Sequence, residues 1–236
     1  MSDRLLVPSI ELRLGSLLEI NRRKEELDIS RSEEARAHKT ITISREYGCE
    51  GYPTAELLKG IMEERTGQPW ELMDKGLLEE VAKHHKLSED LLKGLGEKTR
   101  ILDEMLATFS PRWKSEKDYF RLLCKHVFSL AEKGNVIIVG RGSAIVTQSL
   151  KNCYHFRLYA SSPFKVASIA RRLNISPAEA GEVVEKKQRQ RDAFIRDFLD
   201  RDAHDLRYYH LVFNNDKNPA ERIAGLIADY VLNSRG

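Results

Sequence analysis

The sequence predicts a three-layer α/β fold, with a five-stranded, mainly parallel sheet and helices on both of its faces. Five short segments rich in β-branched or apolar residues alternate with longer helical segments, an order typical of parallel strands joined by crossover helices. One of them, residues 136–139, is an unbroken run of Val and Ile, as expected for a strand buried on both faces. The chain of 236 residues is long enough for one sizeable domain of this kind.

The first predicted strand spans residues 40–44, where β-branched residues alternate with polar ones. Residues 45–53 form a turn that contains two glycines and ends at Pro53. Residues 54–66 carry apolar residues at helical spacing and predict an amphipathic helix. We expect Pro53 at its first position, because the amide that proline lacks would have no partner there. Residues 68–74 are the second predicted strand.

The rest of the chain is predicted to be mostly helical, with the three remaining strands between the helices. An N-cap followed by proline, in Ser162-Pro163 and again in Ser176-Pro177, opens two of these helices. In chain order we expect a helical region over 75–133, a strand over 136–139, a strand over 154–160, a helix from 163 to about 174, a long charged helix from 177, a strand over 209–213 and a helix over 219–232.

Residues 1–39 are predicted to form an N-terminal helical extension and linker, separate from the main domain at 40–236. A partly helical apolar pattern reaches Ile20, and residues 21–39 are dense in Arg, Lys and Glu. Two interpretations remain open: a helix that docks on the domain and is followed by a solvated linker, or a contact surface for a partner chain or for self-association.

The composition excludes several classes of protein. A formal net charge of +3, from 39 basic and 36 acidic residues, argues against a dedicated nucleic-acid coat protein. The three cysteines (Cys49, Cys124 and Cys153) form no CxxC motif, so neither a disulfide framework nor a zinc site is expected. The sequence shows no signal-peptide pattern and no apolar run of roughly 20 residues, so we expect no membrane span and a cytoplasmic location.

The loop from Ser44 to Thr54 is the first candidate site, because open parallel sheets bind ligands beyond the carboxyl ends of their strands. Backbone amides and the positive end of a helix would face an anion there. A phosphate-binding P-loop reads GxxxxGK[ST], but alignment on Gly51 puts Tyr52 at the lysine position and Pro53 at the Ser/Thr position. Taken alone, this spacing does not distinguish a phosphate loop from an ordinary strand–helix turn.

Three further loops or helices carry candidate residues. Asp74-Lys75 follows the second strand and is either a helix start with a solvated lysine or a pair that faces a second substrate or a metal ion. In Gly140-Arg141-Gly142 the glycines allow close approach of the backbone, and the guanidinium suits a phosphate. The arginines between residues 171 and 201 are mostly expected to form solvated i,i+4 ion pairs, while a few on one face of a mobile lid would close over phosphates.

Five segments in order resemble the cytidylate-kinase-like family of the P-loop nucleoside monophosphate kinase superfamily. Residues 40–48 and Gly51 resemble its opening "ITISREYGSGG", and 69–77 resemble its "PYYDKELI" segment. Residues 136–143 resemble its "viiGRGa" strand and loop, Arg191 and Phe194 its "D..R..YY" lid element, and 209–214 its "YDLvIN" strand. The resemblance covers about residues 40–232. It implies a three-layer P-loop kinase fold, with a helical acceptor insert at 75–133 and a helical lid region at 163–208.

The resemblance also implies where substrates bind. ATP, with Mg²⁺, would lie at the first loop, the acceptor between the second and third strands, and the catalytic arginines in the lid. The residues carried over are as follows: for the ATP phosphates Ser44, Arg45, Gly48, Cys49, Glu50, Gly51, Tyr52 and Thr54; for the acceptor Asp74, Lys75 and Arg141; for catalysis Arg172, Arg191 and Arg196. No metal-ligating side chain is assigned.

The chain departs from the family pattern at four positions. The second loop glycine of the family is Glu50 here, its loop arginine is Tyr52, the glutamate after it is Pro53, and the lid aspartate is Gln188. Two functions therefore stay open. The chain is an ATP-dependent kinase for a nucleoside monophosphate (CMP-like) or a related small acceptor, or a catalytically impaired regulator that binds nucleotides or anions. A nucleic-acid-binding module is a distant third, because no surface of interleaved aromatic and basic residues is evident.

Overall fold

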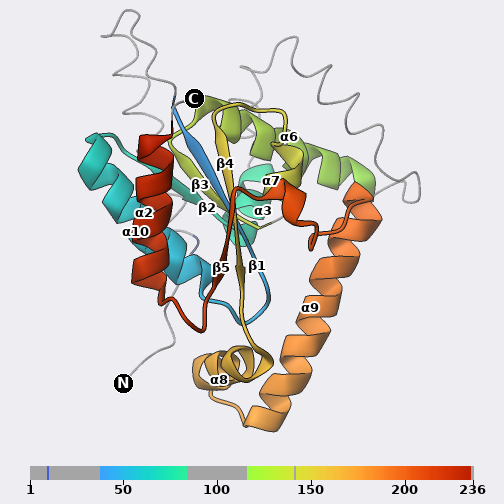
Figure 1. Ribbon diagram of the computed structural model, residues 1–236. Helices are drawn as coiled ribbons and strands as arrows, with labels where there is room; N and C mark the ends of the chain where they lie inside the picture. Colours follow the sequence, from blue (N-terminus) through green and yellow to red (C-terminus); the bar gives the residue numbers. More distant parts are fainter. Residues whose placement is uncertain (1–9, 11–37, 84–115, 141, 235–236) are drawn as a thin grey trace, which may run out of the picture.

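The structure is a computed structural model, and it describes residues 38–83, 116–140 and 142–234 together with Ile10. Within these residues five strands form one sheet in the order β2-β3-β1-β4-β5, and every neighbouring pair is parallel. The strands are β1 Thr40–Arg45, β2 Glu71–Met73, β3 Val136–Val139, β4 Cys153–Tyr159 and β5 Leu211–Asn214. Because all are parallel, their carboxyl ends share one edge, at the bottom of Figure 1.

Two helices cover one face of the sheet. These are α2 (Gly51–Thr66) and α10 (Ala220–Asn233), which pack against each other at the left of Figure 1. The core on this side joins apolar residues of both helices to Ile41, Ile43 and Phe156 of the sheet. Alternate residues of each strand point to this face and the remainder to the other, as the period of two in a strand requires.

The other face is covered by α3 (Lys75–Lys83), α6 (Glu116–Lys133), the short α7 (Ser143–Val146) and the end of α9 (Pro177–Leu199). Their core includes Val136 and Ile138 of β3, while the rings of Phe120, Phe194 and Phe198 meet edge-on or tilted between α6 and α9. Helices on both faces confirm the predicted three-layer α/β fold.

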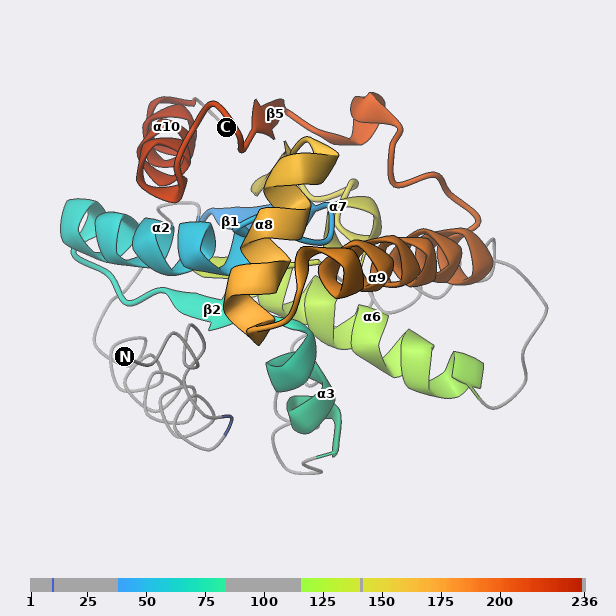
Figure 2. The ribbon, with the colours of Figure 1, turned by 90° about the horizontal axis from the view of Figure 1, so that it is seen from below.

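A helical hairpin projects beyond the carboxyl edge of the sheet. Helix α8 (Ser162–Leu173) leaves the end of β4, and α9 returns along the molecule (Figure 2). Ser161 caps α8, and Ser176 with Glu179 forms a capping box at the start of α9. Left-handed residues, Asn174 and Asp200, end the two helices.

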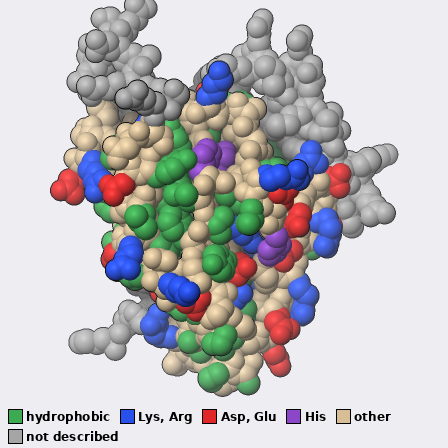
Figure 3. Space-filling view, viewed as in Figure 1, with side chains coloured by type: hydrophobic (Ala, Val, Ile, Leu, Met, Phe, Trp, Pro, Cys, Tyr) green, Lys and Arg blue, Asp and Glu red, His purple; other side chains and the backbone are tan. Residues whose placement is uncertain are grey.

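Most charged side chains of α9 are solvated, as the sequence predicted, whereas Arg191 is partly buried. Positive and negative side chains alternate along the right-hand side of Figure 3, where α9 lies in the same view in Figure 1. The exposed pair Arg189–Glu185, at i,i+4, is one example.

Several element boundaries differ from the prediction; strand β2, for example, spans only Glu71–Met73 of the predicted residues 68–74. Helix α2 begins at Gly51, inside the predicted turn; Pro53 is tolerated there because the first four helical amides lack intrahelical acceptors. Strand β5 begins at Leu211 rather than 209, since Tyr209 ends a 3₁₀ turn over Leu206–Tyr208. Helix α7 was not predicted. The predictions for residues 1–9, 11–37 and 84–115 lie outside the described residues.

None of the helices in the described ranges combines the length and the apolar character that a membrane crossing requires.

Leu58 and its neighbour Leu57 test the packing of α2. Leu58 is fully buried in the core below α10, whereas Leu57 is 39% exposed. We expect Leu58→Ala to lower the free energy of unfolding by about 2–5 kcal/mol, because it leaves a cavity in a packed core. Leu57→Ala should change it by less than about 1 kcal/mol. Urea unfolding of both variants measures this, and equal losses would contradict the assigned packing.

Candidate functional site

The candidate site is the loop between β1 and α2, residues 46–50, at the carboxyl edge of the sheet. Figure 2 looks onto this edge and shows α8 crossing in front of β1 and the start of α2. Gly48 has φ of +98° and lies directly under α8: a Cβ at this position would come within 2.7 Å of Lys165 Cβ. Glycine is therefore needed here both for the backbone conformation and for the close approach of α8.

The backbone amides of this loop already have acceptors. The amide of Tyr47 donates to Gln188 Oε1 at 2.7 Å, and the amide of Glu50 donates to Asn215 Oδ1 at 2.8 Å. The amide of Cys49 donates to the carbonyl oxygen of Glu46 at 3.3 Å. Side-chain oxygens from α9 and from the loop after β5 thus take two amides of the kind that hold phosphate oxygens in a P-loop.

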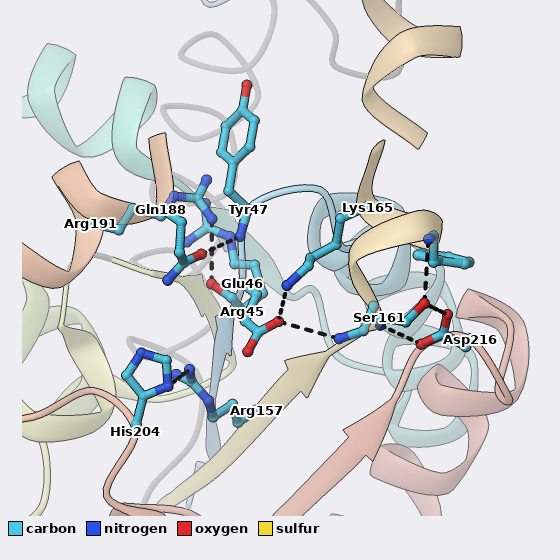
Figure 4. Close-up of polar contacts among 12 residues, drawn as sticks. Arg45, Glu46, Tyr47, Arg157, Ser161, Lys165, Gln188, Arg191, His204 and Asp216 are labelled. Atoms are coloured by element: carbon cyan, nitrogen blue, oxygen red, sulfur yellow. Dashed lines mark hydrogen bonds and ion pairs between the residues drawn. The ribbon is translucent and has the colours of Figure 1, made fainter. Parts of the chain in front are cut away.

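The carboxylate of Glu46 also sits in a setting suited to an anion (Figure 4). Its Oε2 accepts from Lys165 Nζ at 2.8 Å and from the backbone amide of Ala160 at 3.4 Å. This pair is mostly buried, since each side chain is 17% exposed. Glu46 stands at the first glycine position of the P-loop pattern, so this chain brings its own carboxylate to the loop.

Arg191 of α9 closes over the same loop. Its NH1 donates to the carbonyl oxygen of Arg45 at 3.3 Å, and its guanidinium lies 4.8 Å from the ring centroid of Tyr47. Desolvation by burial lowers the pKa of Arg191, and the neighbouring charge of Arg172 acts in the same direction. Of the three predicted lid arginines, Arg191 therefore contacts the loop, and Arg172 lies near enough to Arg191 for its charge to act on it. The third, Arg196, is exposed and pairs with Asp197 at 3.6 Å.

The remaining residues predicted for ATP lie in or beside the loop. Ser44 is half-buried near the end of β1, and Tyr52 is half-buried in the first turn of α2. Arg45 packs its guanidinium against Gly140 and its side-chain carbons against Gly51. Thr54 is buried, and its hydroxyl donates to the carbonyl oxygen of Glu50 at 2.8 Å, so it is engaged within the helix.

Two loop residues carry further side-chain chemistry. The Glu50 carboxylate lies 3.6 Å from Arg171 of α8, an ion pair that also ties α8 to the loop. Cys49 is buried, and this burial, followed by the charge of Glu46, raises the pKa of its thiol to about 12. Cys49 therefore stays a neutral thiol and is not a nucleophile at ordinary pH.

The residues predicted for the acceptor have local roles. Asp74 Oδ1 accepts from the amide of Leu77 at 3.0 Å, which caps α3, and the exposed Lys75 lies 3.7 Å from Glu79. Arg141 lies outside the described residues. In the described part of the chain, the structure thus brings Arg191 of the lid candidates to the predicted ATP loop, leaves Arg196 on the surface, and places Asp74 and Lys75 at the start of α3.

The described residues do not fit a metal site built by the protein. No group of three or more His, Cys, Asp or Glu side chains within them is arranged around a common point. Pro53 stands at the position of the P-loop hydroxyl, and the hydroxyl of Thr54 is turned into the helix. Magnesium at such a loop would therefore depend mainly on the phosphates of a nucleotide, a common mode for this ion.

Sequence reasoning missed Lys165 and Asn215. The rule for open parallel sheets indicates the loops after β4 and β5, where both residues lie, but it does not select a side chain. A lysine one turn into the helix after a strand end was a usable signal for Lys165.

Comparisons with known proteins bear on the family and on the overall fold. A model of the cytidylate kinase-like family matches residues 40–217. The crystal structure of an uncharacterized protein from Eubacterium ventriosum ATCC 27560 has a TM-score of 0.63 and 20% identity, covering 84% of this chain and 99% of that chain. Shikimate kinase from Bacteroides thetaiotaomicron has a TM-score of 0.46 and 14% identity, with 83% and 99% covered. None of the curated proteins matches the chain significantly. The predicted resemblance to this family is confirmed, and the similarity to the Eubacterium ventriosum structure extends over most of the chain.

Gly48 and Gly60 provide a matched test of the loop geometry. We expect Gly48→Ala to destabilise the protein by about 1–2 kcal/mol or more, because alanine disfavours positive φ and its Cβ would overlap Lys165. Gly60→Ala, in an exposed turn of α2 with no atom near its Cβ, should stabilise by about 0.5–1 kcal/mol. Thermal unfolding monitored by circular dichroism distinguishes the two, and a Gly48→Ala variant as stable as the parent would contradict the packing of α8 on the loop.

Proposed function

The chain belongs to the cytidylate kinase-like family, and we propose that it transfers the γ-phosphoryl group of ATP to a nucleoside monophosphate or a related small acceptor. The acceptor is proposed to be CMP-like, from the family alone. The donor phosphates would bind the loop between β1 and α2, and α8 and α9 would act as the lid.

The observation that carries this proposal is the convergence of cations on a loop that has no lysine of its own. Arg191 and Lys165 both reach the loop, and Arg172 lies close enough to act on Arg191. Catalysis of phosphoryl transfer consists largely of positioning and of neutralising charge on the phosphate oxygens. A lysine on α8 and arginines on both lid helices supply that charge from outside the loop.

Binding of ATP requires a rearrangement of three side chains. Phosphate oxygens would take the place of Gln188 Oε1 on the amide of Tyr47 and of Asn215 Oδ1 on the amide of Glu50. They would also displace the Glu46 carboxylate from Lys165. Each exchange replaces one oxygen acceptor with another, so no amide or ammonium group is left without a partner. The hairpin of α8 and α9 would move away and close again, as kinase lids do.

The second candidate function is a regulator that binds nucleotide without transferring phosphate. The engaged hydroxyl of Thr54 and the proline at the P-loop hydroxyl position favour it, because the loop then offers no hydroxyl to a catalytic metal ion. The two functions differ in turnover and not in binding.

Arg191 and the neighbouring exposed Arg189 separate the kinase from the regulator. With Mg-ATP and a panel of nucleoside monophosphates, we expect the parent protein to form ADP in an acceptor-dependent reaction. Arg191→Ala should lower kcat by about 100-fold or more, since it removes a cation at the transferring group. Arg189→Ala, whose guanidinium pairs with Glu185 on the outer surface, should retain kcat within about twofold.

If no ADP is formed, titration calorimetry with ATP shows which of the two functions fails. Saturable ATP binding without ADP formation for any acceptor would reject the kinase and support the regulator. Equal kcat values in the parent and Arg191→Ala would reject the role of Arg191. Neither binding nor turnover would reject both functions.

A further inference from the structure

Strand β4 carries a buried cation at Arg157. Its side chain is 5% exposed although arginines are almost never fully buried unless paired. Within the described residues no carboxylate lies within ion-pair distance of Arg157, whereas Lys165 and Arg171 have Glu46 and Glu50. A buried cation without a counter-charge is costly, and such a position favours an anionic ligand.

Arg157 lies beside the candidate site. It is opposite Ser44 in the register of β1 and β4, one residue before the end of β1. Figure 4 shows it below the Glu46 carboxylate, on the side of the sheet toward α9. The charges of Glu46, Lys165 and Arg157 all act on the thiol of Cys49, so Arg157 is near the loop as well as near the end of β1.

The described partners of Arg157 are neutral. Its NH1 donates to Tyr209 Oη at 3.4 Å, and its NH2 lies 3.1 Å from His204 Nδ1. A guanidinium only donates, so His204 Nδ1 must be the acceptor and the ring proton sits on Nε2, which is 3.4 Å from Asp192 Oδ1. A guanidinium has five N–H donors, and these two contacts leave three for other acceptors.

A polar relay joins Arg157 to the loop. Asp192 Oδ1 accepts from Gln188 Nε2 at 2.8 Å, and Gln188 Oε1 holds the amide of Tyr47. The path therefore runs from the loop amide through Gln188, Asp192 and His204 to Arg157. An anion that displaces Gln188 from Tyr47 removes a partner of Asp192, which in turn positions His204. The His204 side chain, which contacts the guanidinium, is 49% exposed and is therefore not fixed in place by a packed core.

We propose that Arg157 binds a phosphate group of a substrate at this site once the polar relay through Gln188, Asp192 and His204 opens. The inference rests on the proposed function, because it deepens the same site. Arg157 would supply, from β4, a positive charge that the loop lacks at Tyr52. The phosphate belongs either to the donor or to the acceptor, and a planar guanidinium suits both.

The test compares Arg157→Met and Arg157→Lys with Arg189→Met as the surface control, each in the full chain. Calorimetry measures binding of pyrophosphate, ATP and CMP, and of adenosine and cytidine, which carry no phosphate. We expect Arg157→Met to raise the Kd for pyrophosphate, and for ATP or CMP, by about 10- to 100-fold. Arg157→Lys should recover part of the affinity, while Arg189→Met and the nucleosides should show no change.

Each outcome decides the inference. A loss confined to ATP assigns Arg157 to the donor phosphates, and one confined to CMP assigns it to the acceptor phosphate. Unchanged Kd values for all three phosphate ligands overturn the inference, as does an equal loss for the nucleosides, which indicates a structural role. Absence of pyrophosphate binding to the parent protein also overturns it.

Two controls complete the test. If Arg157→Met does not fold, Arg157→Lys decides alone, because lysine keeps the charge but loses the planar fork, and an unchanged Kd overturns the inference. Pyrophosphate binding that depends on Arg157 without any phosphoryl transfer would support the inference while rejecting the proposed kinase. The two claims can therefore fail separately.

Discussion

Backbone amides at the turn between β1 and α2 need oxygen acceptors, and the arrangement of the site follows from how this need is met. A buried amide without an acceptor costs about 1–3 kcal/mol. Here the amides of Tyr47 and Glu50 are satisfied by Gln188 of α9 and Asn215 after β5. The loop is thus tied to segments more than a hundred residues away, and the lid is held on the loop by the groups that an anion would replace.

Electrostatics at the loop depend on groups that come from other elements. The P-loop lysine is replaced by Tyr52, and the cations that reach the loop are Lys165 on α8 and Arg191 on α9. Under the proposed function, in which α8 and α9 form a lid, the charge of the site depends on the position of that lid. A loop with its own lysine attracts phosphate in any lid position, whereas this one gains most of its positive charge only when the hairpin is closed. The Glu46 carboxylate balances part of that charge in the closed state.

The sequence was sufficient for the architecture and insufficient for the contacts. Regular alternation of strand and helix signals, and the apolar run 136–139, predicted the sheet and its layers. The site depends on pairs far apart in the chain, such as Tyr47 with Gln188 and Glu46 with Lys165, and periodicity holds no information about these. Arg157 carried a signal that was not used: a charged residue on a strand whose neighbours, Phe156 and Leu158, are apolar. At Asp74 and Lys75 the sequence signal was a helix start beside a strand end, and the structure shows Asp74 accepting from the amide of Leu77 and Lys75 beside Glu79.

The central claim is that phosphate oxygens replace side-chain oxygens on the loop amides. The most direct measurement is an NMR titration of ¹⁵N-labelled protein with Mg-ATP, following the backbone amides of Tyr47 and Glu50. The account predicts saturable shifts of both resonances, together with a shift of the Gln188 side-chain amide as it leaves Tyr47. Resonances that stay in place at saturating ATP, in a folded protein, would contradict it.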